Sequence, residues 1–212
     1  MTKSAIIGSA WLMLVLTAAA QTVPAIQLPP PLKEGGMPLM QALAERHTSR
    51  EFASDPLPPQ TLSNLLWAAF GVNRPDGHRT APSARNWQET DLYVFLPDGV
   101  YLYDAGANLL QPVLAGDHRA AAGKQEFVKD APLSLVYVAD LARMGDAAPE
   151  DKALYSAADA GFIAQNVYLF CASEGLSVVV RGMVDREQIA KLLHLRSDQK
   201  VILAQTVGYP KP

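Results

Sequence analysis

Two arginines, Arg46 and Arg50, stand four residues apart in this sequence, with His47, Thr48 and Ser49 between them. On a helix end or in a tight coil, this spacing places both guanidinium groups on one side. The planar guanidinium group pairs with two phosphate oxygens at once, and hydroxyl and backbone N–H groups add further donors. The segment is therefore interpreted as a small phosphate clamp. Taken alone, however, so short a pattern is more typical of a charged, solvated helix end.

Residues 80–88, with the sequence TAPSARNWQ, form a second candidate stretch because they are rich in hydrogen-bonding side chains. They lead directly into residues 91–96, which are predicted to form a strand. Pro97, Asp98 and Gly99 predict a turn, and residues 100–103 then return the chain as a hairpin. The sequence contains no Gly-x-Ser-x-Gly elbow, no Walker loop and no paired carboxylates in a motif setting. It therefore offers binding groups without an evident nucleophile or acid–base pair.

Composition limits the possible partners. The chain has 212 residues, 49% of them hydrophobic and 18% charged, which suits one globular domain with a sizeable core. A net charge of −3 argues against nucleic acid as the main partner. The one cysteine, Cys171, lies in an apolar run and is predicted to be a packed core thiol. The four histidines are scattered, so no zinc or iron site is predicted.

The N-terminal segment has the pattern of a secretory signal peptide. Lys3 supplies a positive charge, residues 5–20 are almost wholly apolar, and small residues precede Gln21. We expect cleavage after residue 20, export to the periplasm and no stable membrane span in the mature protein; an uncleaved membrane anchor is the lesser alternative. Residues 21–36 are rich in proline and are expected to form an extended tether. The folded domain is predicted at residues 37–212.

Within that domain, helices and strands alternate in an order that indicates an α+β fold. Apolar spacing and end signals predict helices over residues 37–46, 60–70, 108–114, 118–128 and 151–174, and strands over residues 133–139, 177–180 and 201–208. Asp185 and Gln188 form a capping box that opens one further helix. Residues 151–174 are small or apolar on nearly all sides, which indicates either a central core helix or a subunit interface.

Four segments resemble, in order, the motifs of the nitroreductase-like flavoproteins, which bind FMN. Residues 46–52 (RHTSREF) match the first motif, with Thr48 where the family usually has serine, and residues 82–88 (PSARNWQ) match the second completely. The third is a small-residue helix ending at Gly175, followed by a strand, the turn at Arg181 and Gly182, and Asp185 before a helix. The fourth is the closing Gly-Tyr-Pro at residues 208–210. The resemblance covers residues 37–210.

This resemblance implies a mixed, mainly antiparallel sheet flanked by helices, built as an intertwined homodimer with FMN at the interface. It implies that Arg46 and Arg50 hold the FMN phosphate or ribityl chain, with His47 and Thr48 beside them. The residues implied to approach the flavin from the other subunit are Pro82, Ser83, Ala84 and Asn86. Gln125 or Lys124 is implied to face the pyrimidine edge, and the turn at Arg181 and Gly182 to face N5 and O4 through its backbone N–H groups.

The sequence departs from the family pattern in two places. A basic C-terminal segment that often helps to bind the phosphate is missing, so the clamp is expected to depend on Arg46 and Arg50, with Arg85 as a further candidate. The residue before the turn glycine is often acidic in the family, whereas here it is Arg181. A cation there would either stabilise negative charge on the reduced flavin or point to solvent, and the sequence favours neither.

The resemblance implies an FMN-dependent oxidoreductase that works by a ping-pong mechanism, from NAD(P)H to a nitroaromatic, quinone or enone-type acceptor. Residues 80–83 are also similar to the dehydrogenases that oxidise azolines in modified peptides, so oxidation of an organic or peptide substrate is an alternative. A hypothesis of another class is a secreted, cofactor-free binding module, which the scarcity of NAD(P)H outside the cytoplasm favours and the spacing of Asn86 and Gln88 disfavours. A third possibility is that Arg46 and Arg50 bind another phosphate ligand.

Overall fold

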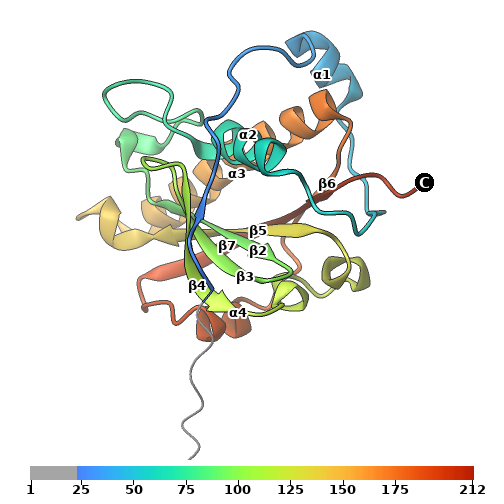
Figure 1. Ribbon diagram of the computed structural model, residues 1–212. Helices are drawn as coiled ribbons and strands as arrows, with labels where there is room; N and C mark the ends of the chain where they lie inside the picture. Colours follow the sequence, from blue (N-terminus) through green and yellow to red (C-terminus); the bar gives the residue numbers. More distant parts are fainter. Residues whose placement is uncertain (1–22) are drawn as a thin grey trace, which may run out of the picture.

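The computed structural model describes residues 23–212, so the signal peptide predicted at residues 1–20 lies outside the described part of the chain. The described residues form an α+β fold in which helices flank one seven-stranded sheet, as the sequence predicted (Figure 1). The strands are β1 (Ile26–Gln27), β2 (Thr90–Leu96), β3 (Gly99–Asp104), β4 (Leu109–Ala115), β5 (Leu133–Asp140), β6 (Ser177–Arg181) and β7 (Gln199–Gly208). The α-helices are α1 (Leu39–Glu45), α2 (Pro59–Phe70), α3 (Pro149–Glu174) and α4 (Arg186–Leu192).

The sheet has the strand order β1-β4-β3-β2-β5-β7-β6, and all its neighbouring strands are antiparallel. Helices α2 and α3 cover one face, and α4 lies on the other (Figure 1). Strand β5 is buried along its whole length, and its side chains alternate between the two cores because successive residues of a strand point to opposite faces. Leu135 and Tyr137 pack with α2 and α3, whereas Val136 and Val138 pack with α4.

The helix predicted at residues 108–114 is wrong, because these residues form strand β4. Pro112 gives the physical reason: it has no N–H to donate and would break the interior of a helix. In β4 it lies opposite Tyr101, beside the point where the register between β3 and β4 shifts. The neighbouring strand β1 pairs only with Leu109 and Leu110. Pro112 therefore faces no partner strand on that side, which is a place where a sheet tolerates proline.

The helix predicted at residues 118–128 is also wrong, because two 3₁₀ turns, Arg119–Ala122 and Glu126–Lys129, take its place. Gly123 lies between them. A Cβ atom at this position would come within 1.6 Å of Nη1 of Arg181, so the close approach of the arginine requires glycine here. Glycine is unfavourable inside a helix, and the chain breaks at this point instead.

The proline-rich stretch lies extended against the domain. Strand β1 pairs with β4, and Leu28 is buried. The carbonyl oxygen of Pro29 accepts two hydrogen bonds, from the Ser63 hydroxyl at 2.6 Å and from the Asn108 side chain at 2.8 Å. Domain side chains thus bind the backbone of a segment whose prolines cannot donate. Within residues 23–212, no helix combines the length and apolarity that crossing a membrane requires.

Helix α3 is covered on one side only in a single chain. Its buried side includes Ile163, Val167 and Cys171, the thiol lying in the core as predicted. The opposite side carries Leu154 and Phe162, whose exposed fractions are 62% and 48%. The chain by itself therefore does not enclose α3, and the interpretation of α3 as a central core helix is wrong for a single chain.

Candidate functional site

Residues 46–52 run as a non-helical segment along the outer edge of strand β6. Helix α1 ends at Glu45, and Arg46 follows it with an extended backbone. The N–H of Ser49 donates to the carbonyl oxygen of Val178 at 3.0 Å, which fastens the segment to β6. Arg46 is therefore the C-terminal cap of α1, whereas Arg50 lies beyond the helix in the segment beside the sheet.

Tyr168 of helix α3 connects this segment to β6. Its phenol oxygen accepts the N–H of Val180 at 3.0 Å and lies 2.9 Å from the Thr48 hydroxyl. The guanidinium group of Arg46 lies over the ring of Tyr168, 5.4 Å from its centroid, in a cation–π contact. His47 is exposed, and its Nδ1 lies 2.8 Å from the last carbonyl oxygen of α1. Arg46 and Thr48 are thus both positioned by one buried tyrosine.

A cavity of about 450 Å³ lies next to Arg50. It is lined by Arg50, Glu51, Phe52, Phe127, Asp130 and Lys211. Two cations and two carboxylates meet there, and the rings of Phe52 and Phe127, 5.4 Å apart, form an apolar wall. Lys211 is a basic C-terminal group that the sequence interpretation did not count, because a single lysine does not make a basic segment.

Arg181 ends strand β6 with a side chain that is only 4% exposed. Its guanidinium group donates to the carbonyl oxygen of Ala122 at 2.8 Å and to the hydroxyl of Thr206 at 2.7 Å. Burial lowers the pKa of Arg181 to about 10, because desolvation disfavours the charged form, so the group stays charged at neutral pH. The side chain does not point to solvent, whereas the next residue, Gly182, is exposed.

Gln125 lies between the two 3₁₀ turns that face Arg181. Its Oε1 atom is buried and has no hydrogen-bond partner among the described residues. An unpaired buried acceptor costs free energy, so this oxygen is available to a donor on a ligand. Phe127, in the second of these turns, contacts both β6 and the segment beside it. Its ring lies 6.0 Å from the guanidinium carbon of Arg181 and 5.4 Å from the ring of Phe52. Lys124, the alternative to Gln125, lies near Asp185, with 3.9 Å between Nζ and Oδ2.

Residues 82–88 form a loop with a strained backbone. Arg85, Asn86 and Gln88 have φ angles of 49°, 54° and 48°, a left-handed region that costs a residue other than glycine about 1 kcal/mol or more. The Ser83 hydroxyl accepts the N–H of Gln88 at 3.0 Å, and the Asn86 side chain accepts an amide hydrogen from Gln88 at 2.9 Å. Pro82 and Asn86 are exposed, so the loop presents them outward.

Behind this loop lie two buried carboxyl groups that the sequence interpretation did not pair. Asp159 of α3 is 3% exposed and accepts the N–H of Ala84 at 2.9 Å. Glu89 is fully buried, and its carboxyl group lies close enough to Asp159 for the two acids to affect each other's ionisation. Burial, with a further contribution from the charge of Asp159, raises the pKa of Glu89 to about 7. Burial also raises the pKa of Asp159, which the Ala84 N–H and Glu89 oppose, so Glu89 carries the shared proton.

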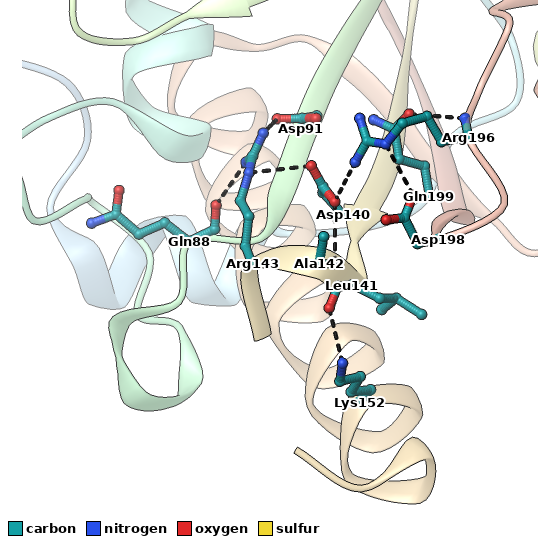
Figure 2. Close-up of polar contacts among 10 residues, drawn as sticks. All are labelled: Gln88, Asp91, Asp140, Leu141, Ala142, Arg143, Lys152, Arg196, Asp198 and Gln199. Atoms are coloured by element: carbon teal, nitrogen blue, oxygen red, sulfur yellow. Dashed lines mark hydrogen bonds and ion pairs between the residues drawn. The ribbon is translucent and has the colours of Figure 1, made fainter. Parts of the chain in front are cut away.

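Gln88, at the other end of the loop, is fixed by an ion network at the end of the sheet (Figure 2). Arg143 donates to the carbonyl oxygen of Gln88 at 3.1 Å and pairs with Asp91 at 2.7 Å. Asp140 joins Arg143 to Arg196, at 3.5 Å and 2.8 Å. Burial raises the pKa of Asp91, and the charge of Arg143 opposes that shift. Both arginine side chains are largely exposed, so the network holds the loop in place but contributes little stability.

The structure gathers the candidate residues into two groups rather than one. The β6-edge group consists of Arg46, His47, Thr48, Arg50, Gln125, Arg181 and Gly182. The loop group consists of Pro82, Ser83, Ala84 and Asn86. Tyr168 contacts the first group and Asp159 the second. The two residues are nine positions apart along α3, which corresponds to about 14 Å of helix axis. One chain therefore does not bring the two groups together.

Comparison with known proteins points to one family. Residues 43–209 match the family model described as the nitroreductase family. The chain is 32% identical over 168 residues to a nitroreductase-family protein of Methanocaldococcus jannaschii, a match that covers 74% of this chain and 85% of that protein. The crystal structure of a nitroreductase-like protein of Ralstonia eutropha is 46% identical, with a TM-score of 0.86 over 92% of this chain and 93% of that chain. The microcin synthetase complex of Escherichia coli, 17% identical with a TM-score of 0.68 over 88% of this chain and 79% of that chain, shares the fold.

Proposed function

This chain belongs to the nitroreductase family, and from that premise we propose that it is an FMN-dependent oxidoreductase that transfers hydride from NAD(P)H to a nitroaromatic, quinone or enone-type acceptor. Family membership supports a flavin oxidoreductase in general terms. One observation carries the finer assignment: at the β6 edge, a basic segment, an exposed glycine turn and an unpartnered buried glutamine oxygen lie together.

The β6-edge group fits the chemical groups of FMN. Arg46 and Arg50 supply the planar donors that phosphate needs. The unpartnered Oε1 of Gln125 suits the N–H of the flavin pyrimidine ring, and the exposed backbone at Gly182 is open to a hydrogen bond with the ring edge. When bound, FMN supplies hydride transfer at its N5 atom. The protein then has to bind, orient and leave one face open, so that the hydride donor departs before the acceptor enters.

Arg181 adds a fixed positive charge to this edge. Its hydrogen-bonding partners are neutral carbonyl and hydroxyl groups, and it takes part in no ion pair among the described residues. A buried charge without a counter-ion acts over a longer range than an exposed one, because water screens it less. Arg181 therefore favours binding of an anionic ligand at the β6 edge, through the field of the side chain rather than by contact.

A second copy of the chain completes the proposed site. The β6-edge group and the loop group lie apart within one chain, and α1 and α3 expose large apolar side chains that a partner would cover. These include Met40 at 75%, Leu154 at 62% and Phe162 at 48% exposure. We expect a dimer by light scattering and dissociation in Phe162→Glu, with Gln188→Glu, exposed on α4 at the other face of the sheet, as the control. A monomeric wild-type protein would contradict this.

The decisive experiment on the cofactor compares two double variants. Arg46→Ala with Arg50→Ala removes both phosphate donors, and a charged hydrogen bond contributes about 1.5–3 kcal/mol, so FMN should bind about 100-fold more weakly or worse. Lys191→Ala with Lys200→Ala removes the same charge at two exposed positions outside both groups and should leave the affinity unchanged. Equal FMN affinity in the two double variants would show that the clamp is assigned to the wrong residues.

The same protein preparation separates the other hypotheses. A flavoprotein that is bleached by an organic or peptide substrate but not by NADH or NADPH would be a dehydrogenase working in the oxidising direction. A colourless protein that cannot be reconstituted with FMN would favour the cofactor-free binding module. Periplasmic activity is part of the proposal because of the signal peptide predicted at residues 1–20, and cell fractionation tests it. Recovery of the activity in the cytoplasmic fraction alone would refute that part.

A further inference from the structure

A buried side chain from another element holds the loop at Ala84, whereas Arg79 and Arg143 hold it at Gln88 and Tyr155 contacts Trp87. Ala84 donates its N–H to Oδ2 of Asp159 at 2.9 Å, and Asp159 lies on helix α3. The sequence separates the two residues by 75 positions, so this contact is tertiary. A hydrogen bond to a carboxylate is stronger than one between neutral groups, and this one is shielded from water because Asp159 is almost fully buried.

The contact is placed where the backbone is most strained. Immediately after Ala84, Arg85 and Asn86 adopt positive φ angles, and Gln88 does so again. Such conformations persist only where the surroundings determine them, and they concentrate at functional sites. The hydrogen bonds between Ser83, Asn86 and Gln88 stay within the loop. They shape the loop but do not fix it to the domain.

Glu89 explains how Asp159 can be buried in this position. Its carboxyl group lies near Asp159 and not against a cation, and its Oε2 accepts no hydrogen bond from the described residues. Neither carboxyl forms an ion pair within residues 23–212. A protonated Glu89 donates to Asp159 and leaves the second oxygen of Asp159 for Ala84. One shared proton thus satisfies both acids and keeps the acceptor for the loop.

We propose that Asp159 is a positioning residue for the cofactor site: through the N–H of Ala84 it holds residues 82–88 in the strained shape that meets FMN, with Glu89 as its buried carboxyl neighbour. This inference rests on the proposed function for the identity of the ligand. The contact between Asp159 and the loop is independent of the proposed function, because it is present in the protein without FMN. Because the loop group is proposed to face the flavin of the other subunit, Asp159 acts on the site across the dimer.

The test uses four variants of the full mature chain and two measurements. Asp159→Ala removes the acceptor, whereas Asp159→Asn keeps an oxygen of the same shape for Ala84 and an N–H₂ group for Glu89. Ala84→Pro removes the donor from the other side, and Ser83 before it already has the extended backbone that a following proline requires (φ −136°, ψ 148°). Ser156→Ala is the control, because Ser156 is equally buried on α3 but bonds only within its own helix.

The first measurement is amide exchange in the absence of FMN. We expect the N–H of Ala84 to exchange about 10- to 100-fold faster in Asp159→Ala, the effect of one lost charged hydrogen bond, and at the wild-type rate in Asp159→Asn and Ser156→Ala. The second is FMN affinity, which should fall at least about tenfold in Asp159→Ala and Ala84→Pro while Asp159→Asn restores it. A merely structural residue would lower thermal stability together with affinity, so the affinities are compared well below the melting temperature of each variant.

Three results would overturn the inference: unchanged exchange at Ala84 in Asp159→Ala, faster exchange with unchanged FMN affinity, or an Asp159→Asn protein as impaired as Asp159→Ala. If Asp159→Ala does not fold, the FMN affinity of Ala84→Pro tests the same contact from the loop side. Failure of the proposed function is a separate outcome. A wild-type protein that binds no FMN refutes the cofactor assignment, and the exchange measurement still decides whether Asp159 fixes the loop.

Discussion

The buried proton on Glu89 makes the stability of this protein depend on pH in a calculable way. Glu89 has its pKa raised from 4.5 to about 7, chiefly by burial. The folded state therefore binds a proton more tightly than the unfolded state, and the stability gained is fully present below pH 4.5 and is lost as pH rises through 7. With 1.36 kcal/mol per pKa unit, the whole effect is about 3 kcal/mol, of which about 2.5 kcal/mol falls between pH 5 and pH 8.

Glu89→Gln isolates this contribution. The amide has nearly the same shape, keeps an oxygen for the Thr90 hydroxyl and donates to Asp159 at every pH. The free energy of unfolding is measured by urea titration at pH 5, 6, 7 and 8 and at fixed flavin content. The value for Glu89→Gln minus that for the wild type should rise by about 2.5 kcal/mol across this range. Glu126→Gln is the control, because Glu126 is fully exposed and Lys129 lowers its pKa, so no rise of that sign is expected. Parallel pH profiles for Glu89→Gln and the wild type would refute the shared proton.

Three further predictions concern the packing around the site. Arg181→Ala should lower the free energy of unfolding by about 3 kcal/mol in urea titrations, because it leaves a cavity and an unsatisfied carbonyl at Ala122; a loss below about 1 kcal/mol would contradict the buried hydrogen bonds. Gly123→Ala should cost a similar amount, since the new Cβ atom would displace the Arg181 guanidinium, and a neutral effect would mean that the arginine lies elsewhere. Arg143→Ala should cost no more than about 1 kcal/mol at low salt, with the difference vanishing at high salt, because the pair with Asp91 is partly solvated; a loss that salt does not change would show a buried role.

The sequence predicted correctly the helices and strands whose signals lie within the element itself. The cap at Asp185 is an example: its carboxylate accepts the N–H of Gln188 at 3.0 Å at the start of α4, as the capping box indicated. Strand β5 followed from its apolar, β-branched composition, and α3 from its small and apolar residues and its end signals. The error at residues 108–114 came from weighing apolar spacing above Pro112, whose missing N–H was the stronger signal. The break at Gly123 depends on Arg181, 58 residues later, and no local pattern carries that information.

The candidate site shows the same limit. The sequence motifs named the basic segment and the loop, and the structure places each at a defined position, but it keeps them apart within one chain. Glu89 and Asp159 could not be paired from the sequence, because 70 residues separate them and neither belongs to a motif with the other. For Arg181, the sequence left open a role beside the flavin or a solvated side chain, and the structure buries the side chain behind Gly182. Only tertiary packing decides such questions.

Anaerobic reduction of the purified protein tests the central proposal most directly. The protein should be yellow with bound FMN, and its flavin absorbance should bleach when NADH or NADPH is added without oxygen and return when a quinone or nitroaromatic acceptor follows. Return of the colour after the oxidised nicotinamide has been removed would support the ping-pong order. A protein that neither retains nor takes up FMN, or a bound flavin that no hydride donor reduces, would contradict the account.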